Sequence, residues 1–369
     1  MSTLLMSPIS VGDGLDKLSI LEIKYKCADS EETKIEIRKA IDEISSSLGK
    51  YQSQVKFYYE QLYKTNKIIM DLNDKVRDTS IPCEEYYKLS VGLIENNEHC
   101  LRIKNKINYI TDSSLKERIN HKMNKIVVAP HFGLGDMFMM VGAIRYYSLI
   151  YEQVITFCTQ HNYSTVQKIF QDDKSIQIDI SDWNDIYRQL DTKYNNSDYK
   201  VVRCGLVIPG NDLKDLGDEF YNHFYQNINL DPSIRFNYFY ITRDLVHEKH
   251  IFDNTVGKID KYIFTHDKGN NPFAEFFKDK EDMCVYHPNR NYYPEGHKYH
   301  HVWNGYHENI VSYATIIENA SEIYVVDSSF WCFINFLNVK ATKRVILDPK
   351  WYNIKYFPHE NERNKWTFV

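Results

Sequence analysis

A carboxylate in a glycine-rich turn is the feature of this sequence with the clearest chemical potential. Asp136 ends the segment Gly133-Leu-Gly-Asp136, which separates a short apolar run over 126–129 from a helical apolar pattern over 137–149. The glycines let the backbone approach a ligand, and a helix N-terminus favours negative charge. Because a carboxylate in such a turn repels phosphate, Asp136 is predicted to act as a base or to contact hydroxyl groups. The alternative is an N-cap for the helix, a position at which Asp is favoured.

A second turn carries hydroxyl groups instead. The segment Asp327-Ser-Ser329 lies between a predicted strand, 323–326, and a predicted helix, 330–337. Ser328 and Ser329, together with the amides that open the helix, are predicted to bind a diphosphate, and simple capping is the alternative. Asp327 is expected either to join this site or to bond the amides of its own turn.

Cationic and imidazole side chains near these turns are candidates for binding an anionic leaving group. Arg243, Lys268 and Arg290 are the candidate cations, although a solvated surface position is the default for each of them. His266 and Asp267 end a predicted strand, 262–267, and strand ends of open α/β sheets face the ligand. We therefore assign His266 and Asp267, with the three cations, to the same ligand site as the Asp327–Ser329 turn.

The spacing of glycines argues against two common nucleotide motifs. The dinucleotide fingerprint needs a third glycine where Phe138 stands, and an acidic residue after the second strand, which ends in Cys158-Thr-Gln160. A P-loop of the form Gly-x-x-x-x-Gly-Lys-[Ser/Thr] does not occur either. The sequence thus favours neither a nicotinamide-dependent oxidoreductase nor a P-loop nucleotidase.

A cluster of histidines raises the question of a metal. Its members are His287, His297, His300, His301 and His307. Their spacing matches no closed zinc site and no paired cysteines lie nearby, so a ligand-facing loop is the preferred interpretation. No Asp-x-Asp dyad follows a strand, which removes the usual sign of a metal-held diphosphate. No metal ligand and no resident cofactor are expected.

Hydrophobic periodicity predicts the elements that position these residues. The pattern over residues 1–124 predicts an all-α helical hairpin or bundle. From Lys125 onward, the hydrophobic pattern predicts alternating strands and helices. The predicted strands are 126–129, 154–159, 176–180, 199–207, 262–267, 283–287, 323–326 and 344–347. The predicted class is α/β: a Rossmann-like lobe over 125–250 and another over 251–369, following the helical module. The two lobes are expected to close over a cleft that Asp136 faces.

The helical module shows capping signals and an apolar stripe but no chemistry. Val11-Gly-Asp-Gly14 reads as a turn before the first helix, and Ser30-Glu-Glu-Thr33 as a cap for the second. The stripe expected to face inward in the second helix consists of Ile35, Ile37, Ile41, Ile44 and Leu48. A packing, spacing or oligomerisation role is predicted for this module.

Composition narrows the class of protein. Of the 369 residues, 43% are hydrophobic and 26% charged, and the net charge is −5, which argues against a nucleic-acid-binding protein. The seven cysteines are scattered, as is typical of reduced thiols. The N-terminus lacks the pattern of a signal peptide, and no run of about 20 apolar residues occurs. The sequence therefore predicts a cytoplasmic protein without a transmembrane segment.

The two turns resemble those of the heptosyltransferase-like glycosyltransferases of GT-B fold. Gly133-Leu-Gly-Asp136 is similar to the turn that opens their acceptor-side domain, and Val325-Val-Asp-Ser-Ser329 to the turn near their sugar nucleotide. The family's histidine after the second turn is missing here, where Phe330, Trp331 and Cys332 stand. Segments 239–244 and 262–267 resemble parts of microbial and viral glycosyltransferase-like proteins, and segment 10–24 resembles a small bacterial helical module.

This resemblance implies an enzyme that moves a sugar from a nucleotide-diphosphate sugar to a glycan or other acceptor. The reaction would be inverting and metal-independent, with Asp136 as catalytic base and the 251–369 lobe binding the donor. His131, Gly133 and Gly135 would then lie on the acceptor side. The alternative is a non-catalytic nucleotide-sugar-binding or assembly protein, since this fold hosts many functions. The sequence names neither the donor, the acceptor nor the oligomeric state.

Overall fold

The computed structural model of the chain describes residues 8–78, 80–115, 125–195, 198–205, 220–267, 269, 272–303, 309–347 and 366–369. These residues form two compact units. The first draws on the ranges 1–124, 147–153 and 172–175, and the second on 125–146, 154–171 and 176–369. No helix in the described ranges has both the length and the apolar character needed to cross a bilayer.

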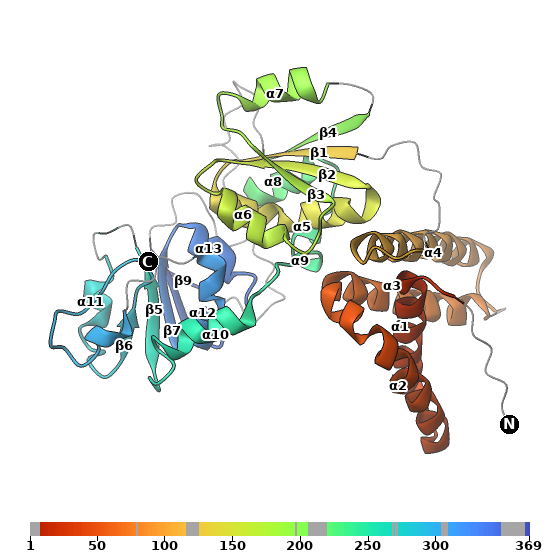
Figure 1. Cartoon of the computed structure of the whole chain (residues 1–369), viewed down its shortest axis with the longest axis horizontal. Helices are drawn as coiled ribbons and strands as arrows, with labels where there is room; N and C mark the ends of the chain where they lie inside the picture. Colours follow the sequence, from red (N-terminus) through yellow and green to blue (C-terminus); the bar gives the residue numbers. More distant parts are fainter. Residues whose placement is uncertain are drawn as a thin grey trace. The chain divides into compact units, whose positions relative to one another are not determined.

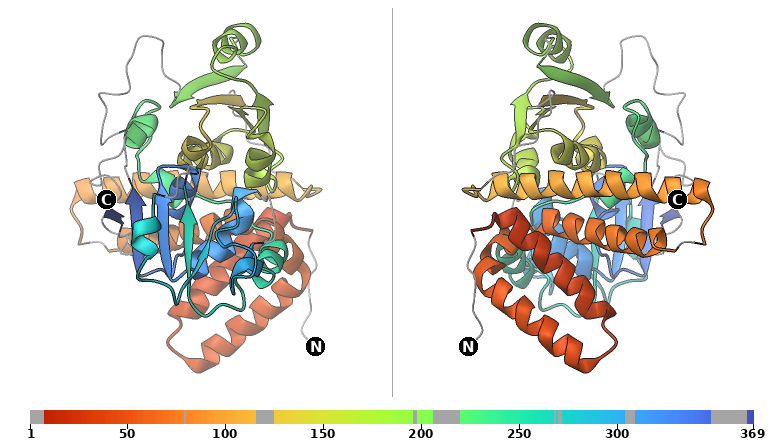
Figure 2. Two further views of the ribbon diagram at one scale, coloured as in Figure 1. Left: turned by 90° about the vertical axis from the view of Figure 1, so that its left-hand side faces the viewer. Right: turned by 90° about the vertical axis from the view of Figure 1, so that its right-hand side faces the viewer.

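Among the described residues, four helices lie wholly within the first unit, in agreement with the helical periodicity of its sequence. They are α1 (Val11–Cys27), α2 (Glu31–Gln54), α3 (Lys56–Val76) and α4 (Cys83–Ile110). Figure 2 shows them as long rods, with α3 and α4 joined as a hairpin. The expectation of a turn over 11–14 is wrong, because Ser10 caps α1 by accepting from the Asp13 amide and the helix begins at Val11. A Cβ on Gly12 would lie 2.5 Å from the Lys104 carbonyl oxygen, so this glycine lets α1 approach α4.

The apolar stripe of α2 is only partly covered. Ile41 is buried, as expected, whereas Ile35 is 70% exposed. Ile37, Ile44 and Leu48 are half-buried. The reason is that α2 packs mainly on α1, and one helix covers a narrower stripe than the sequence offers.

Buried polar contacts attach segments 147–153 and 172–175 to this helical unit. Tyr58 of α3 donates to the Asp173 carboxylate, and its hydroxyl lies 3.1 Å from the Ser148 hydroxyl. The Lys106 ammonium of α4 is 2.5 Å from Ser175 Oγ, and that hydroxyl in turn donates to Asp173. Tyr58, Lys106, Asp173 and Ser175 are thus all hydrogen-bonded, as is usual for buried polar side chains.

The second unit contains two parallel sheets. The first has the strand order β3-β2-β1-β4, and the second β6-β5-β7-β8-β9. The strands of the first are β1 (Lys125–Pro130), β2 (Gln153–Cys158), β3 (Ile176–Ile180) and β4 (Tyr199–Cys204). Those of the second are β5 (Tyr262–His266), β6 (Cys284–Tyr286), β7 (Glu322–Val326), β8 (Lys343–Leu347) and β9 (Thr367–Phe368). The α/β class with two Rossmann-like sheets is confirmed.

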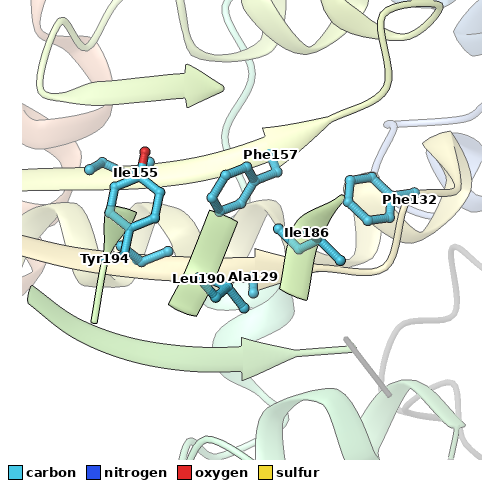
Figure 3. Packing of buried hydrophobic residues seen from close by; sticks show 8 residues of the cluster. Ala129, Phe132, Ile155, Phe157, Ile186, Leu190 and Tyr194 are labelled. Atoms are coloured by element: carbon cyan, nitrogen blue, oxygen red, sulfur yellow. The ribbon is translucent and has the colours of Figure 1, made fainter. Parts of the chain in front are cut away.

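Helices cover both faces of each sheet (Figure 1). Those associated with the first sheet are α5 (Leu134–Ile150), α6 (Tyr163–Phe170), α7 (Ile186–Lys193), α8 (Phe220–Gln226) and α9 (Ile234–Asn237). Those of the second are α10 (Leu245–Asp253), α11 (Ala274–Phe277), α12 (Ala314–Asn319) and α13 (Ser329–Ile334), with 3-10 turns at His300–Val302 and Ile310–Tyr313. Figure 3 shows how Ile186 and Leu190 of α7 pack on Ala129, Ile155 and Phe157 of β1 and β2.

The element ends differ from the predicted ones at several places. The helix predicted over 183–190 begins later, at Ile186, and the strand predicted over 283–287 is only three residues long. The helix predicted over 310–319 opens as a 3-10 turn, and β9 was not foreseen. Residues 206–207, the end of the strand predicted over 199–207, lie outside the described part of the chain. The boundary between the two predicted lobes at 250 stays a prediction.

Each strand order contains a point where the chain changes direction within the sheet. In the first sheet the chain moves from β1 to β2 and β3 on one side, and β4 is then added on the other side of β1. In the second sheet, β5 is followed by β6 on one side and β7 on the other. Ligands of open α/β sheets bind beside the carboxyl ends of strands at such points. The turn after β1 and the turns after β5 and β7 are therefore the places to look for a site.

Candidate functional site

Asp136 lies in the first turn of α5, not at its N-cap. The helix begins at Leu134, and the Met137 amide already donates to the Gly133 carbonyl at 3.0 Å. The N-cap alternative for Asp136 is therefore wrong, because helical hydrogen bonding starts before this residue. Its carboxylate can turn toward other side chains instead.

The Asp136 carboxylate is bonded by an imidazole and by a phenol. His131 Nδ1 lies 2.6 Å from Asp136 Oδ2, and the Tyr221 hydroxyl of α8 donates to Asp136 Oδ1 at 3.2 Å. The Asp136 side chain is 13% exposed and that of His131 26%. A carboxylate and an imidazole in direct contact, both reachable from solvent, form a pair of the kind that moves protons in enzymes.

The two glycines of the turn make room for this pair and for the neighbouring lobe. A Cβ on Gly133 would lie 2.2 Å from Asp136 Oδ2, so any larger residue displaces the carboxylate. A Cβ on Gly135 would lie 2.9 Å from Cys332 Sγ and 3.4 Å from Ser329 Cα, both in α13. Gly135 thus brings the start of α5 against the start of α13, and the two predicted turns are neighbours.

Aromatic rings surround His131. Trp183 contacts the imidazole edge-on with ring centroids 4.7 Å apart, and Phe224 is roughly parallel to it at 6.3 Å. Phe132 also packs on Trp183, at 5.2 Å. The rings restrict the orientation of the imidazole. The sequence shows no periodic or spacing signal for Trp183, Tyr221 or Phe224, and these residues were missed.

Cys332 is a buried neighbour of the pair rather than a nucleophile. Its Sγ lies 3.6 Å from the Tyr221 hydroxyl. Burial, together with the nearby charges of Asp136 and Asp327, raises the pKa of the Cys332 thiol well above its ordinary value. A neutral thiol is a poor nucleophile, so Cys332 fills space beside Tyr221.

A second group of polar side chains gathers where β5 and β7 end. The His266 imidazole lies between two partners, with Nδ1 3.2 Å from Ser328 Oγ and Nε2 3.4 Å from Asn289 Nδ2. Ser328 precedes α13 as its N-cap residue, and Ser329 is the first residue of that helix. The structure therefore brings His266, Ser328 and Ser329 together, and Asn289 is a member that the sequence did not indicate.

Asp267 and Arg290 form an ion pair beside this group. Arg290 Nη2 donates to Asp267 Oδ2 at 2.6 Å, and Arg290 Nη1 to the Gly269 carbonyl at 3.1 Å. The Gly269 amide donates to the other Asp267 oxygen at 2.7 Å. The Asp267 side chain is buried, whereas Arg290 is 29% exposed. Arg290 can thus present charge to a ligand while Asp267 anchors it.

Arg243 lies in a different environment from the one predicted. Its guanidinium bonds the buried Glu248 carboxylate through Nε and Nη2, and Glu318 through Nη1 at 2.8–2.9 Å. Thr315 completes the cluster by donating to Glu248 at 2.7 Å. Two carboxylates neutralise this arginine, so it ties α10 to α12 and we leave it out of the site. Lys268 lies outside the described residues.

The histidines of the 287–307 loop bond within the loop and its neighbours. His287 is buried, and burial lowers the pKa of its imidazole to about 4. His297 stacks on Tyr293 with centroids 4.3 Å apart, and His300 Nδ1 lies 3.0 Å from the Tyr293 carbonyl. His307 lies outside the described residues. Among the residues that the structure describes, no three His, Cys, Asp or Glu side chains form a group that could hold a metal.

Comparison with known proteins finds similarity among solved structures. No protein-family model and no curated protein sequence matches the chain. Among solved structures it is similar to TibC, an iron-containing dodecameric glycosyltransferase of enterotoxigenic E. coli, with TM-score 0.38 and 15% identity over 64% of this chain and 61% of TibC. The chain thus spans less than two thirds of TibC.

Two further solved structures match this chain over larger shares of their own length. The glycosyl transferase family 9 protein of Veillonella parvula matches with TM-score 0.37 and 9% identity, over 69% of this chain and 88% of that one. The E. coli heptosyltransferase WaaC with ADP matches with TM-score 0.35 and 11% identity, over 60% and 86%.

Proposed function

We propose that this protein is a glycosyltransferase that moves a sugar from a nucleotide-diphosphate sugar to a hydroxyl-bearing acceptor, such as a glycan. The reaction needs a base beside the acceptor hydroxyl and polar groups beside the departing diphosphate. The His131–Asp136 pair supplies the first, and Arg290, Ser328 and Ser329 are our candidates for the second.

One observation carries this proposal. The close approach of Gly135 to Ser329 makes the turn with the carboxylate a neighbour of the turn with the hydroxyls. Both turns follow strands next to the direction changes of their sheets, where open α/β folds bind ligands. A base and a polar anion-binding group side by side are what a direct displacement requires. We propose an inverting, metal-independent reaction: a single base with direct displacement supports inversion, and the lack of an Asp-x-Asp motif after a strand supports metal independence.

A thermal-shift screen with UDP, GDP, CMP and ADP sugars tests whether a donor binds. A ligand that binds only the folded state adds about 2.7 kcal/mol of stability at 100 times its Kd, so one nucleotide class should raise the melting temperature. A flat response to every sugar nucleotide would instead support the alternative, a non-catalytic assembly protein.

The variant Asp136→Asn tests the chemistry. We expect it to keep the fold and the thermal shift while the release of nucleoside diphosphate falls at least ~100-fold, as for the loss of a general base. Asp191→Asn, the same change at an exposed site on α7, is the matched control and should keep the wild-type rate. Unchanged turnover by Asp136→Asn would remove this carboxylate from the mechanism.

A further inference from the structure

The geometry of the His131–Asp136 contact defines which ring nitrogen carries the proton. His131 Nδ1 is 2.6 Å from Asp136 Oδ2, a distance typical of a charge-assisted hydrogen bond. The Gly133 amide also points at Nδ1, but from 3.4 Å, which is too long to compete. The shorter contact favours a hydrogen on Nδ1 that is shared with the carboxylate, and in that neutral tautomer the lone pair resides on Nε2.

The Asp136 carboxylate is less suited than this imidazole to take a proton from an acceptor. Both of its oxygens accept hydrogen bonds, one from His131 and one from Tyr221, and it is the less exposed side chain of the pair. A general base must lie within hydrogen-bond reach of the proton that it takes, and histidine is the side chain that most often has this role.

We propose that His131 is the proton acceptor of the reaction and that Asp136 is the group that orients it. This assignment rests on the proposed glycosyl transfer. His131 Nε2 takes the proton of the acceptor hydroxyl, and the freed electron pair of that oxygen forms the bond to the anomeric carbon. The bond from that carbon to the diphosphate oxygen breaks, and its electrons leave with the nucleoside diphosphate. The Asp136 carboxylate stabilises the imidazolium that results.

The surroundings of the ring support this role. Trp183 and Phe224 restrict the imidazole plane, so that the Nδ1 contact to Asp136 also sets the direction of Nε2. Tyr221, through its bond to Asp136 Oδ1, holds the carboxylate from the other side. In other catalytic sites a carboxylate likewise orients an imidazole base, and the imidazole takes the proton of a hydroxyl nucleophile.

Imidazole NMR tests the pair without any substrate. In protein labelled with 15N-histidine, we expect the His131 ring to show a protonated Nδ1 and an unprotonated Nε2, and we expect Asp136→Asn to remove this preference. The His131→Gln spectrum assigns the signal. A wild-type ring protonated at Nε2 would overturn the inference, since Nδ1 would then accept rather than donate.

Three substitutions of His131, by Asn, Gln and Ala, test the proton transfer. Asn places an amide donor where Nδ1 lies, Gln places one nearer Nε2, and Ala leaves a space. With the sugar nucleotide that gives the largest thermal shift, we expect each variant to release nucleoside diphosphate at least ~100-fold more slowly than wild type. Added imidazole should restore His131→Ala at least ~10-fold, and should leave Asp136→Asn unchanged.

The outcomes separate this inference from the proposed function. If His131→Asn keeps more than a tenth of the wild-type rate, or if imidazole fails to restore His131→Ala, the ring only holds Asp136 and the inference is wrong while the glycosyl transfer stands. If wild-type protein turns over none of the sugar nucleotides, the proposed function fails, and the proton transfer fails with it. Retained thermal shifts in the variants confirm that they are folded.

Discussion

At the end of β1 the carboxylate of Asp136 is bonded by an imidazole and a phenol, whereas at the end of β5 the carboxylate of Asp267 is bonded by a guanidinium. The latter arrangement recurs away from the strand ends, where Arg243 binds Glu248 of α10 and Glu318 of α12. Two lobes of one architecture thus give their carboxylates different partners.

Under the proposed mechanism, the difference separates the carboxylate that orients a proton acceptor from carboxylates that bind a guanidinium. A guanidinium stays protonated at any pH that a protein experiences, so its partner remains an anion and the pair holds neighbouring elements together. An imidazole has a neutral and a protonated form, so a carboxylate bound to it can orient the neutral ring and stabilise the imidazolium. Under the proposed function, the first lobe provides the proton acceptor, the Asp267–Arg290 pair provides a cation, and the Arg243 cluster holds α10 and α12 together.

Replacing Arg243, which ties α10 to α12, should have the largest effect on the free energy of unfolding. Arg243→Gln leaves Glu248, 2% exposed, without its counter-charge, and we expect the free energy of unfolding to fall by about 3–5 kcal/mol in urea denaturation. The Arg188 side chain, which pairs with Asp185, is 75% exposed. Arg188→Gln breaks this surface pair and should lower the free energy of unfolding by less than about 1 kcal/mol. Equal losses in the two variants would contradict a structural role for Arg243.

The buried imidazole of the second lobe should make stability depend on pH. Burial lowers the pKa of His287 to about 4, whereas the unfolded side chain titrates near 6.5, so unfolding takes up a proton in this window. The stability that depends on a neutral His287 is fully present above pH 6.5. As the pH falls toward 4, the free energy of unfolding decreases by at most about 3 kcal/mol. His287→Gln should flatten the pH dependence of the unfolding free energy there.

The exposed His161 provides the control for that measurement. His161→Gln should leave the slope between pH 6.5 and 4 as it is in wild type. The slope, rather than the absolute stability, is compared, because a glutamine at position 287 also changes packing. An unchanged slope in His287→Gln would show that the buried ring is not the group that titrates.

Crowding the first turn should have the smallest effect in free energy and should affect turnover more than folding. In Gly133→Ala the added Cβ, 2.2 Å from Asp136 Oδ2, pushes the carboxylate away from His131. We expect nucleoside diphosphate release to fall about 10–100-fold, or roughly 1.4–2.7 kcal/mol of barrier. Gly92→Ala meets only a Leu72 methyl at 3.7 Å and serves as the control. A normal rate in Gly133→Ala would show that the turn does not need its glycine.

Much of the fold could be predicted because the signals are local. Apolar runs and helical periodicity predict β1, α5 and β7 to within a few residues, since each element shows its own pattern. The glycine turn predicted over 133–136 is shorter in the structure, because α5 begins at Leu134 and includes Gly135 and Asp136. Where a short element depends on its neighbours, as β6 and β9 do, the prediction missed its ends or its existence, because pairing rather than propensity forms such strands.

The site could be predicted only in part. Ser328 and His266 were assigned together from their positions at strand ends, and they do contact one another. Arg243 and Arg290 were equal candidates in the sequence. In the structure, Arg243 is bound by two carboxylates, whereas Arg290 lies beside the strand ends, where it binds Asp267. Glu248 lies five positions from Arg243, but the sequence does not show that it binds the guanidinium, and Glu318 and Asp267 lie 75 and 23 positions from their arginines.

The sequence by itself determined the elements and the place of one carboxylate after the first strand, since hydrophobic period and turn chemistry act between near neighbours. Only the tertiary structure decided that Tyr221 and His131 would bond that carboxylate, and that its turn would meet Ser329. Strand order brings those residues together, and it results from long-range pairing whose free energy is spread over whole sheets.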